Sequence, residues 1–160
     1  VMVRFKNRYI IAEILGDDGE PLWDSAMSGL AVHTAVKAAM LDVSGEVGWA
    51  ACAGSLSIKL CHSSTGLIVI RCSRDTHSAV WCAMTLVRQI QKTGCQLRVL
   101  SVCGKVCANG FQHTTGAVRT CQSRALAAVQ NKLRDRPNKS GPTADALLSE
   151  AQSAIAALAY

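Results

Sequence analysis

The chain of 160 residues carries 17 basic and 11 acidic side chains, a formal net charge of +6, and 49% of its residues are apolar. So large an apolar share excludes wholesale disorder, and the length suits one domain with a buried core. Aromatic residues reach only 4%, so aliphatic side chains and cysteine must build that core. The excess positive charge is typical of proteins that bind polyanions, although a solvated basic surface would have the same composition.

The eight cysteines predict buried free thiols rather than a disulfide framework. Most of them stand inside apolar runs, whereas small secreted disulfide scaffolds lack so large an apolar core. No apolar run reaches the roughly 18 residues that a membrane span needs, and no signal-peptide pattern follows the basic start. We therefore expect a soluble intracellular protein.

The first predicted element is a strand with a row of positive charge. In RFKNRYIIAEIL, residues 4–15, the cations Arg4, Lys6 and Arg8 recur at every second position. Side chains alternate across a strand, so these three cations share one face at a spacing of about 6.6 Å. The second half of the segment is apolar on both faces apart from Glu13. This pattern predicts an inner strand whose first half projects beyond its neighbours. Its row of cations could bind a partner whose negative charges are regularly spaced.

Five more elements and a turn at 16–21 complete the predicted core. The periodicity predicts a helix, two strands joined as a hairpin, a second helix and a fourth strand. These elements span residues 24–43, 49–62, 67–72, 75–93 and 96–104. SGEVG at 44–48 breaks the chain after the first helix, and Gly94 stands where a left-handed cap would end the second. The order predicts an α+β sandwich like the RNA-recognition-motif and ferredoxin-like folds: a four-stranded antiparallel sheet with both helices on one face.

The last third of the sequence adds helices to this core. Residues 117–133, AVRTCQSRALAAVQNKL, have helical apolar spacing and could cover part of the free sheet face. Residues 134–142 have the composition of a linker, and residues 143–160 form an amphipathic helix. Its apolar stripe packs on this chain's own domain or, alternatively, in a groove on a partner. We therefore predict a domain over 2–133, a linker over 134–142 and a terminal helix over 143–160.

Candidate catalytic and metal-binding residues are few. Cys103, Cys107 and His113 could supply zinc ligands, but their spacing is not a standard one. Cys121 could act as a nucleophile beside His113, yet residues 76–134 contain no acid to orient the histidine. No phosphate-binding loop, dinucleotide fingerprint or carboxylate cluster of a metal-dependent nuclease is present. The sequence argues against catalysis by the protein itself and leaves a thiol or zinc enzyme as the weaker alternative.

The same acid-free stretch holds eight basic residues. Within it, TTGAVRTCQ at 114–122 places Arg119 and Thr120 at a predicted helix start, where backbone N–H groups and a guanidinium can bind an anion. The sheet offers little for base stacking, because the predicted third strand has no aromatic residue. We therefore expect any RNA contact to be made to phosphates, riboses and overall shape.

Three separated motifs resemble one known family. MVRFKNRYIIAEIL at the start, TGLIVIRCSRD with AVWCAMTLV in the middle, and HTTGAVRTCQ late in the chain occur in that order. They are similar to the small processing-of-precursors (Pop-type) protein subunit shared by ribonuclease P and ribonuclease MRP. The similarity covers roughly residues 2–133. The chain departs from the family pattern in its longer cysteine-rich loop at 103–113 and in an Ala-rich last helix where an acidic tail is expected.

The resemblance implies a non-catalytic RNA-binding subunit that supports a catalytic RNA in removing 5′ leaders from precursor tRNA and in processing precursor rRNA. The implied partners are ribonuclease P RNA or MRP RNA, precursor tRNA within the particle, a barrel-like protein subunit and further subunits, with no membrane. Mg²⁺ would be held by the RNA and no cofactor by the protein, in a particle of the nucleus and nucleolus. The alternative is a protein-interaction module that makes no RNA contact.

The resemblance also assigns RNA contacts by position, to which the acid-free stretch adds Lys105 and Arg124. The candidate RNA-binding residues are Arg4, Lys6, Arg8, Tyr9, Arg71, Arg74, Lys105, Arg119, Thr120 and Arg124. Arg71 could instead be a strand-end charge paired with Asp75. The hypothesis requires that the cations of the first strand and of the later third converge on one part of the surface.

Overall fold

A curled antiparallel sheet of five strands forms the centre of the computed structural model, which describes residues 6–20, 22, 27–104, 117–134 and 144–158. The strands are β1 (Asn7–Gly16), β2 (Ser57–His62), β3 (Leu67–Ser73), β4 (Gln89–Ile90) and β5 (Thr93–Cys103). The helices are α1 (Gly29–Ala53), α2 (His77–Leu86), α3 (Ala117–Arg134) and α4 (Ala144–Ala156). The strand order is β2-β3-β1-β5-β4. The α+β class and the central place of β1 are confirmed, whereas the prediction of four strands was wrong because β4 adds a fifth.

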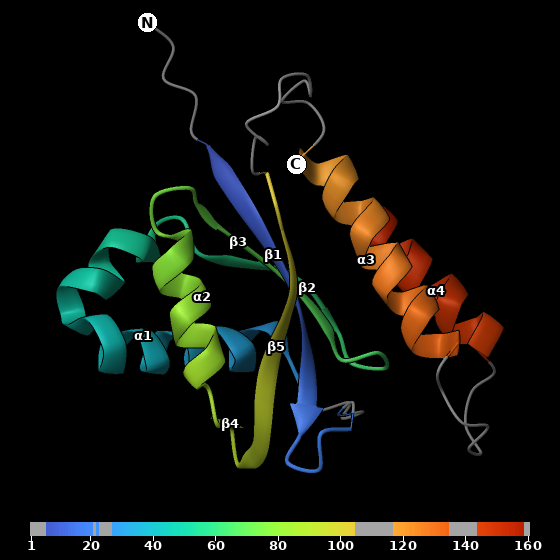
Figure 1. The fold of residues 1–160 in the computed structure, drawn as a ribbon, viewed down its shortest axis with the longest axis horizontal. Coiled ribbons are helices and arrows are strands. Elements are labelled where there is room, and N and C mark those ends of the chain that lie inside the picture. Colours follow the sequence, from blue (N-terminus) through green and yellow to red (C-terminus); the bar gives the residue numbers. More distant parts are fainter. Residues whose placement is uncertain (1–5, 21, 23–26, 105–116, 135–143, 159–160) are drawn as a thin grey trace, which may run out of the picture.

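Side chains of β1 point alternately to the two faces of the sheet, and helices cover both faces. Ile10, Ala12 and Ile14 belong to one apolar core, and Ile11 belongs to a second core on the opposite face. α1 and α2 cover the first face, and α3 and α4 cover the second (Figure 1). The prediction that the two early helices share one face, with added C-terminal helices covering the other, is therefore confirmed.

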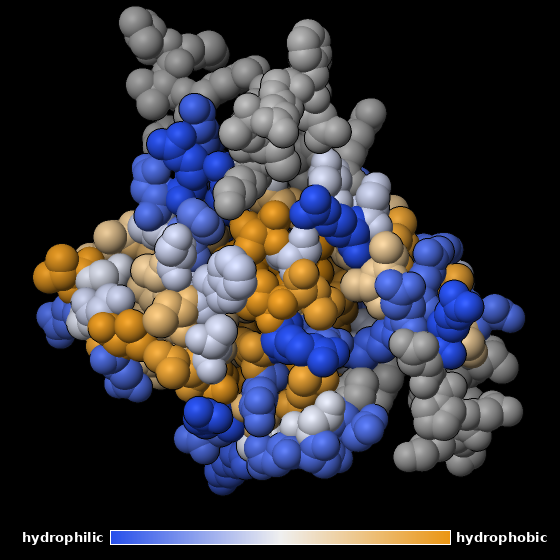
Figure 2. Space-filling model, viewed as in Figure 1, coloured by the Kyte–Doolittle hydropathy of each residue, from blue (hydrophilic) through white to orange (hydrophobic). Residues whose placement is uncertain are grey.

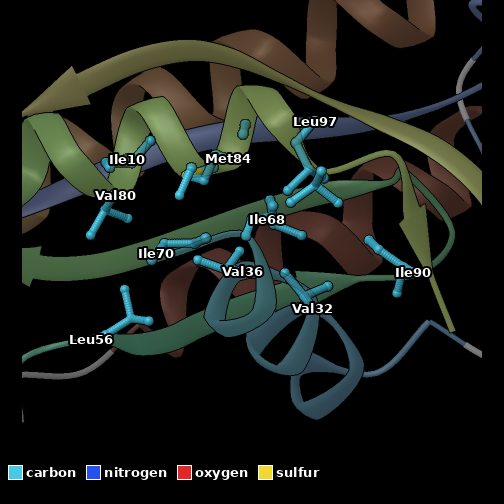
Figure 3. Close-up of a cluster of buried hydrophobic side chains, with 14 of the residues drawn as sticks. Ile10, Val32, Val36, Leu56, Ile68, Ile70, Val80, Met84, Ile90 and Leu97 are labelled. Atoms are coloured by element: carbon cyan, nitrogen blue, oxygen red, sulfur yellow. The ribbon is translucent and has the colours of Figure 1, made fainter. Parts of the chain in front are cut away.

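The core beneath α1 and α2 is built from aliphatic side chains, as the scarcity of aromatic residues predicts. Val32 and Val36 of α1 and Met84 of α2 point towards Ile68 and Ile70 of β3 (Figure 3). All five side chains are fully buried. Burial of this kind supplies most of the favourable free energy of folding.

Helix α1 is longer than the sequence pattern predicts. Ser28 caps its start by accepting a hydrogen bond at Oγ from the Ala31 N–H at 3.2 Å, four residues after the predicted start at residue 24. The expected break does occur at Gly45, whose φ of 64° and ψ of −169° interrupt the helix. Helical structure then resumes as far as Ala53, because Trp49 packs back onto the core. The prediction of a strand over 49–62 was therefore wrong in its first part.

Helix α2 is shorter than predicted and ends at Leu86. Ile90 is fully buried, and the chain there turns into the short hairpin of β4 and β5. The left-handed residue of this turn is Gln91, with a φ of 57°, whereas Gly94 lies inside β5. A Cβ at Gly94 would meet only the carboxylate of Asp17, whose exposed side chain can move aside. The prediction of Gly94 as a helix cap was wrong, because α2 ends at Leu86 and Gly94 already belongs to β5.

The hairpin of β2 and β3 contains a register shift that the sequence did not reveal. Simple alternation would place Ile58 and Leu60 on one face of the sheet. The shift between these two residues instead sends Ile58 into the core under α1 and α2 and Leu60 into the core under α3 and α4. A bulge of this kind lets one strand serve both cores.

Helix α3 lies over β1 and β5, and α4 packs against α3 and β2. The apolar stripe of α4 is buried through Leu147, Ala151 and Ile155, so the stripe docks on this chain's own domain. The predicted linker over 134–142 begins with the last residue of α3 and otherwise lies outside the described residues. Within the described ranges, no helix combines the length and apolar character that crossing a membrane requires.

Candidate nucleic-acid interface

Strand pairing brings cations from two parts of the sequence to one end of the sheet. β1 runs antiparallel to β3, so Arg8 lies opposite Cys72, and Tyr9 lies opposite Arg71. Just beyond the ladder, the Lys6 carbonyl accepts a hydrogen bond from the Arg74 N–H at 2.8 Å. We call this group, which consists of Lys6, Arg8, Arg71 and Arg74, the cationic end.

Arg8 has a like charge nearby. Its guanidinium is on the side of the sheet that α1 and α2 cover, and Nη1 donates to the Asn7 carbonyl at 3.2 Å. Burial and the positive charge of Arg74 lower the pKa of Arg8, although Asp75 acts in the opposite direction. Arg74 forms an exposed ion pair with Asp75 at 3.1 Å, and such surface pairs contribute little. A phosphate at this position would relieve the repulsion between the two guanidinium groups.

Arg71 lies on the opposite face of the sheet, next to Tyr9. With the Asn7 amide oriented so that its oxygen faces the guanidinium, Arg71 donates to it from Nε at 3.2 Å and from Nη2 at 3.1 Å. Asp75 pairs with Arg74. The alternative in which Arg71 is paired with Asp75 is therefore wrong. Asn7 is a positioning residue that sequence reasoning missed, although its place between two cations was a signal.

Arg124 of α3 reaches the same end of the sheet from the second face. Its Nη1 donates to Ser101 Oγ at 2.7 Å and lies 3.5 Å from the Val102 carbonyl oxygen. Residues 101–103 of β5 pair with residues 9–11 of β1, which follow directly on the cationic end. Thr120 lies one helical turn before Arg124 and is half-buried. Arg8 and Arg124 reach this end of the sheet from opposite faces, so their convergence on one part of the surface stays a prediction.

Several predicted site residues cannot be placed. Arg4, Lys105, Cys107 and His113 lie outside the described residues, as do residues 114–116. Arg119 belongs to α3, and its side chain is not described. Within the described part of the chain, no three ligating side chains come together as a metal site. The contacts predicted for these residues stay predictions.

Two cations of the acid-free stretch have an internal role. Glu13 is 4% exposed, and its carboxylate is paired with Arg98 of β5 and with Lys132 of α3. The sequence signal was an acid inside an otherwise apolar strand, but nothing local identified its partners. Arg98 and Lys132, two of the eight basic residues of the stretch, are therefore paired with a buried carboxylate.

Acidic residues gather at the opposite end of the sheet. Asp17, Asp18 and Glu20 are exposed in the turn after β1, about 30 Å from the cationic end at the rise of an extended chain. Figure 2 shows hydrophilic side chains at both ends of the molecule, with an apolar band between them. The charge is therefore polarised along the strands, with the positive pole at the start of β1.

Comparison with known proteins identifies the family of this chain. A family model for the Rpp14/Pop5 family matches residues 8–109. The chain belongs to the Rpp14/Pop5 family, which confirms the resemblance to the Pop-type subunits.

Three curated relatives illustrate the family. The chain is 29% identical over 125 residues to the ribonuclease P/MRP protein subunit POP5 of Bos taurus, a match that covers 76% of this chain and 65% of that protein. It is 30% identical over 135 residues to the probable ribonuclease P/MRP protein subunit POP5 of Arabidopsis thaliana, with 82% of each chain covered. The human POP5 subunit is 27% identical over 121 residues, 76% of this chain and 68% of its own length. The match thus spans just under two thirds of the bovine protein.

Proposed function

We propose that this chain is a protein subunit of the ribonuclease P and ribonuclease MRP ribonucleoproteins. It binds ribonuclease P RNA or MRP RNA through the cationic end and supports that RNA in 5′-leader removal from precursor tRNA and in processing of precursor rRNA. The chemistry and its Mg²⁺ belong to the RNA, and the particle assembles in the nucleus and nucleolus with a barrel-like subunit and further proteins. The topology proposed is ferredoxin-like, with β4 as an added edge strand.

The observation that carries the proposal is that Lys6, Arg8, Arg71 and Arg74 lie at one end of the sheet, with Arg124 close by. In the described residues, only Arg74 of these five has a carboxylate partner, and that pair is exposed. Phosphates are the ligand that suits such a group, because each contact releases counterions from the RNA. Family membership supports the same function independently.

The test is a salt series with the full chain and its ribonuclease P RNA or MRP RNA. The logarithm of the association constant should fall linearly with the logarithm of the salt concentration. Lys6→Ala with Arg8→Ala should flatten that slope by up to about 1.8, at about 0.9 for each lost phosphate contact. Fluorescence anisotropy of labelled RNA measures both quantities.

The matched control removes one lysine and one arginine from the other end of the sheet. Arg88 and Lys92 are exposed beside β4, close to the acidic turn. Arg88→Ala with Lys92→Ala changes the net charge by the same amount and should leave the slope unchanged. A flat salt series in the unmodified protein, or equal effects of the two double variants, would overturn the proposed site.

A further inference from the structure

The sheet narrows to two strands at its cationic end. β1 pairs with β3 from Asn7, but its ladder with β5 starts only at Tyr9. The ladder between β2 and β3 likewise stops at Arg71 of β3, before the β1–β3 pairing ends at Ser73. In the described part of the chain, the sheet beyond these two ladders is therefore a two-stranded ribbon of β1 and β3. Figure 1 shows the start of β1 between the layer of α1 and α2 and the layer of α3 and α4.

One face of this ribbon carries Arg8. Arg8 lies opposite Cys72, which belongs with Ile10 to the core under α1 and α2. Residues directly opposite each other in an antiparallel pair share a face, so Arg8 is on the side of that core. Its Nη1 donates to the Asn7 carbonyl at 3.2 Å, and no described carboxylate is paired with it. A guanidinium has five N–H donors, so donors remain for a phosphate on this face.

The other face carries Arg71 and Arg124. Arg71 lies opposite Tyr9, which packs against the core under α3 and α4. Arg124 of α3 donates from Nη1 to Ser101 Oγ at 2.7 Å, and Ser101 lies opposite Ile11 of the same core. Neither guanidinium is paired with a described carboxylate. Cations without an acidic partner therefore lie on both faces of one sheet end.

A phosphate backbone that runs along one face of the ribbon cannot reach the guanidinium groups of the other face, because the strands lie between them. Contact with both faces requires two backbone segments with the ribbon between them. The side of an uninterrupted RNA helix offers no such place, since its major groove is deep and narrow and its minor groove is shallow. A β-ribbon enters the wider major groove of B-form DNA, about 12 Å across. RNA provides a comparable opening at a helix junction or beside unpaired nucleotides.

We propose that the sheet end is inserted between two backbone segments of the RNA, with Arg8 on a phosphate of one segment and Arg71 and Arg124 on phosphates of the other. This two-sided contact rests on the proposed RNA binding and adds the class of RNA structure that the site recognises. That class is a helix junction, or a groove widened by unpaired nucleotides, rather than the side of a continuous duplex.

Hydroxyl-radical footprinting of the full chain on its ribonuclease P RNA or MRP RNA tests the two-sided contact. The unmodified protein should protect two backbone stretches that lie apart in the RNA secondary structure. Arg8→Gln should lose protection of one stretch, and Arg71→Gln should lose protection of the other. The control Arg88→Gln removes an exposed cation beside β4 and should leave both stretches protected.

Salt dependence separates failure of the two-sided contact from failure of the proposed function. If Arg8→Gln and Arg71→Gln each flatten the salt slope by about 0.9 but expose the same stretch, the protein binds RNA through one face and the two-sided contact is wrong. If RNA binding shows no dependence on salt, the proposed function fails as well.

The unmodified protein gives a further measurement that does not depend on the folding of a variant. Its affinity is compared for a three-way RNA junction and for an uninterrupted duplex of the same length and base composition. We expect several-fold tighter binding to the junction and a steeper salt slope, because phosphates on both faces are contacted. Equal affinities and slopes for the two RNAs would overturn the two-sided contact.

Discussion

Glu13 connects three elements through one buried carboxylate. Its Oε1 is bonded by Arg98, and its Oε2 lies 3.1 Å from Lys132 Nζ, which also donates to the Thr65 carbonyl at 2.6 Å. The Glu13 and Lys132 side chains are 5% and 13% exposed, whereas Arg98 is 63% exposed. Burial lowers the pKa of Lys132, and the Glu13 charge acts against that shift. The carboxylate thus favours the charged form of a buried lysine beneath α3.

Glu13→Gln should destabilise the fold by roughly 3 kcal/mol, because it removes the buried carboxylate charge that is paired with Lys132 and Arg98. Urea denaturation at neutral pH measures this loss. Arg98→Ala is the control and should cost less than about 1 kcal/mol, since Arg98 is exposed to solvent. Equal losses of stability in the two variants would show that burial of the Glu13–Lys132 pair does not determine how much the pair stabilises the fold.

Cys72 makes the stability of the fold sensitive to alkaline pH. Burial raises the pKa of its thiol from 9.0 to about 11, with Cys52 adding to the shift and Arg8 opposing it. The unfolded chain therefore loses this proton first as the pH rises. The stabilisation is fully present below about pH 9 and is lost progressively towards about pH 11, at roughly 1.4 kcal/mol for each pKa unit.

Urea denaturation in reducing buffer between about pH 8 and about pH 10 tests this dependence. Cys72→Ala should make the decline with pH shallower, whatever it does to stability at pH 8. Cys82→Ala changes an exposed cysteine and should leave the decline as it is. The explanation fails if both variants decline with the slope of the unmodified protein.

Local pattern predicts which side chains share a face and says nothing about distant partners. The alternation along residues 4–15 placed Arg8 on the face of Ile10 correctly, since Arg8 lies opposite Cys72 of the same core. The Glu13 to Arg98 bond, by contrast, joins residues 85 positions apart in the sequence. The pairing of Arg71 with Asn7 was missed for a similar reason, since it depends on the register between two strands.

At the scale of elements, the kink in α1 depends on a single glycine. Gly45 has a φ of 64° and a ψ of −169°, a conformation that residues with a side chain rarely adopt. Gly45→Ala should therefore destabilise the fold by about 1–3 kcal/mol, measured by urea denaturation.

Gly54, at the end of the same helix, supplies the matched control for this prediction. Its φ of −70° and ψ of −16° suit any residue, and nothing lies within 4 Å of a methyl group placed there. Gly54→Ala should leave stability unchanged or raise it by about 0.4–1 kcal/mol. Identical effects of the two substitutions would contradict the assignment of strain to Gly45.

Helix α4 contributes to this chain's own stability. Ile155 is 1% exposed against the core of α3 and the sheet, and Gln122 of α3 donates from Nε2 to the Ile155 carbonyl at 3.2 Å. Ile155→Ala should cost about 2–5 kcal/mol by thermal or urea unfolding, whereas exposed Gln152→Ala should stay within about 0.5 kcal/mol. An unchanged stability in Ile155→Ala would mean that α4 docks only weakly here.

Helical and strand periodicity identified most elements, but their ends depend on tertiary contacts. α2 and the predicted helix over 75–93 differ because Ile90 is buried by the β4–β5 hairpin, which sequence periodicity cannot detect. α1 continues past its break because Trp49 packs against the core under α1 and α2. The register shift in β2 likewise depends on tertiary contacts, because Ile58 and Leu60 of this strand pack into different cores.

For the whole molecule, the separation of charge has a directional effect. The positive pole at the start of β1 and the acidic turn after it would orient the protein as it approaches a polyanion. The acids and the first cations lie at opposite ends of one strand, but this separation was not predicted from the sequence. The sequence also did not show that β3 and α3 would add Arg74 and Arg124 to the same pole.

If the cationic end binds RNA as proposed, neutralising the acidic turn should raise RNA affinity only slightly and by the same factor at every salt concentration. Asp18→Asn with Glu20→Gln raises the net charge by two, the same size of change as in the double cation variants. The salt slope should stay constant, because no phosphate is bound at that end, and affinity should rise by less than about threefold. A change of slope as large as that of the Lys6 and Arg8 variant would place RNA at both ends.

The central position of β1 has a consequence for biosynthesis. β1 pairs with β3 on one side and with β5 on the other, so its last neighbour is complete only at Cys103. While the ribosome is still translating that region, the nascent chain carries an unpaired apolar strand that can associate with other chains. Translation that halts before β5 is finished would therefore leave a product that depends on chaperones to avoid aggregation.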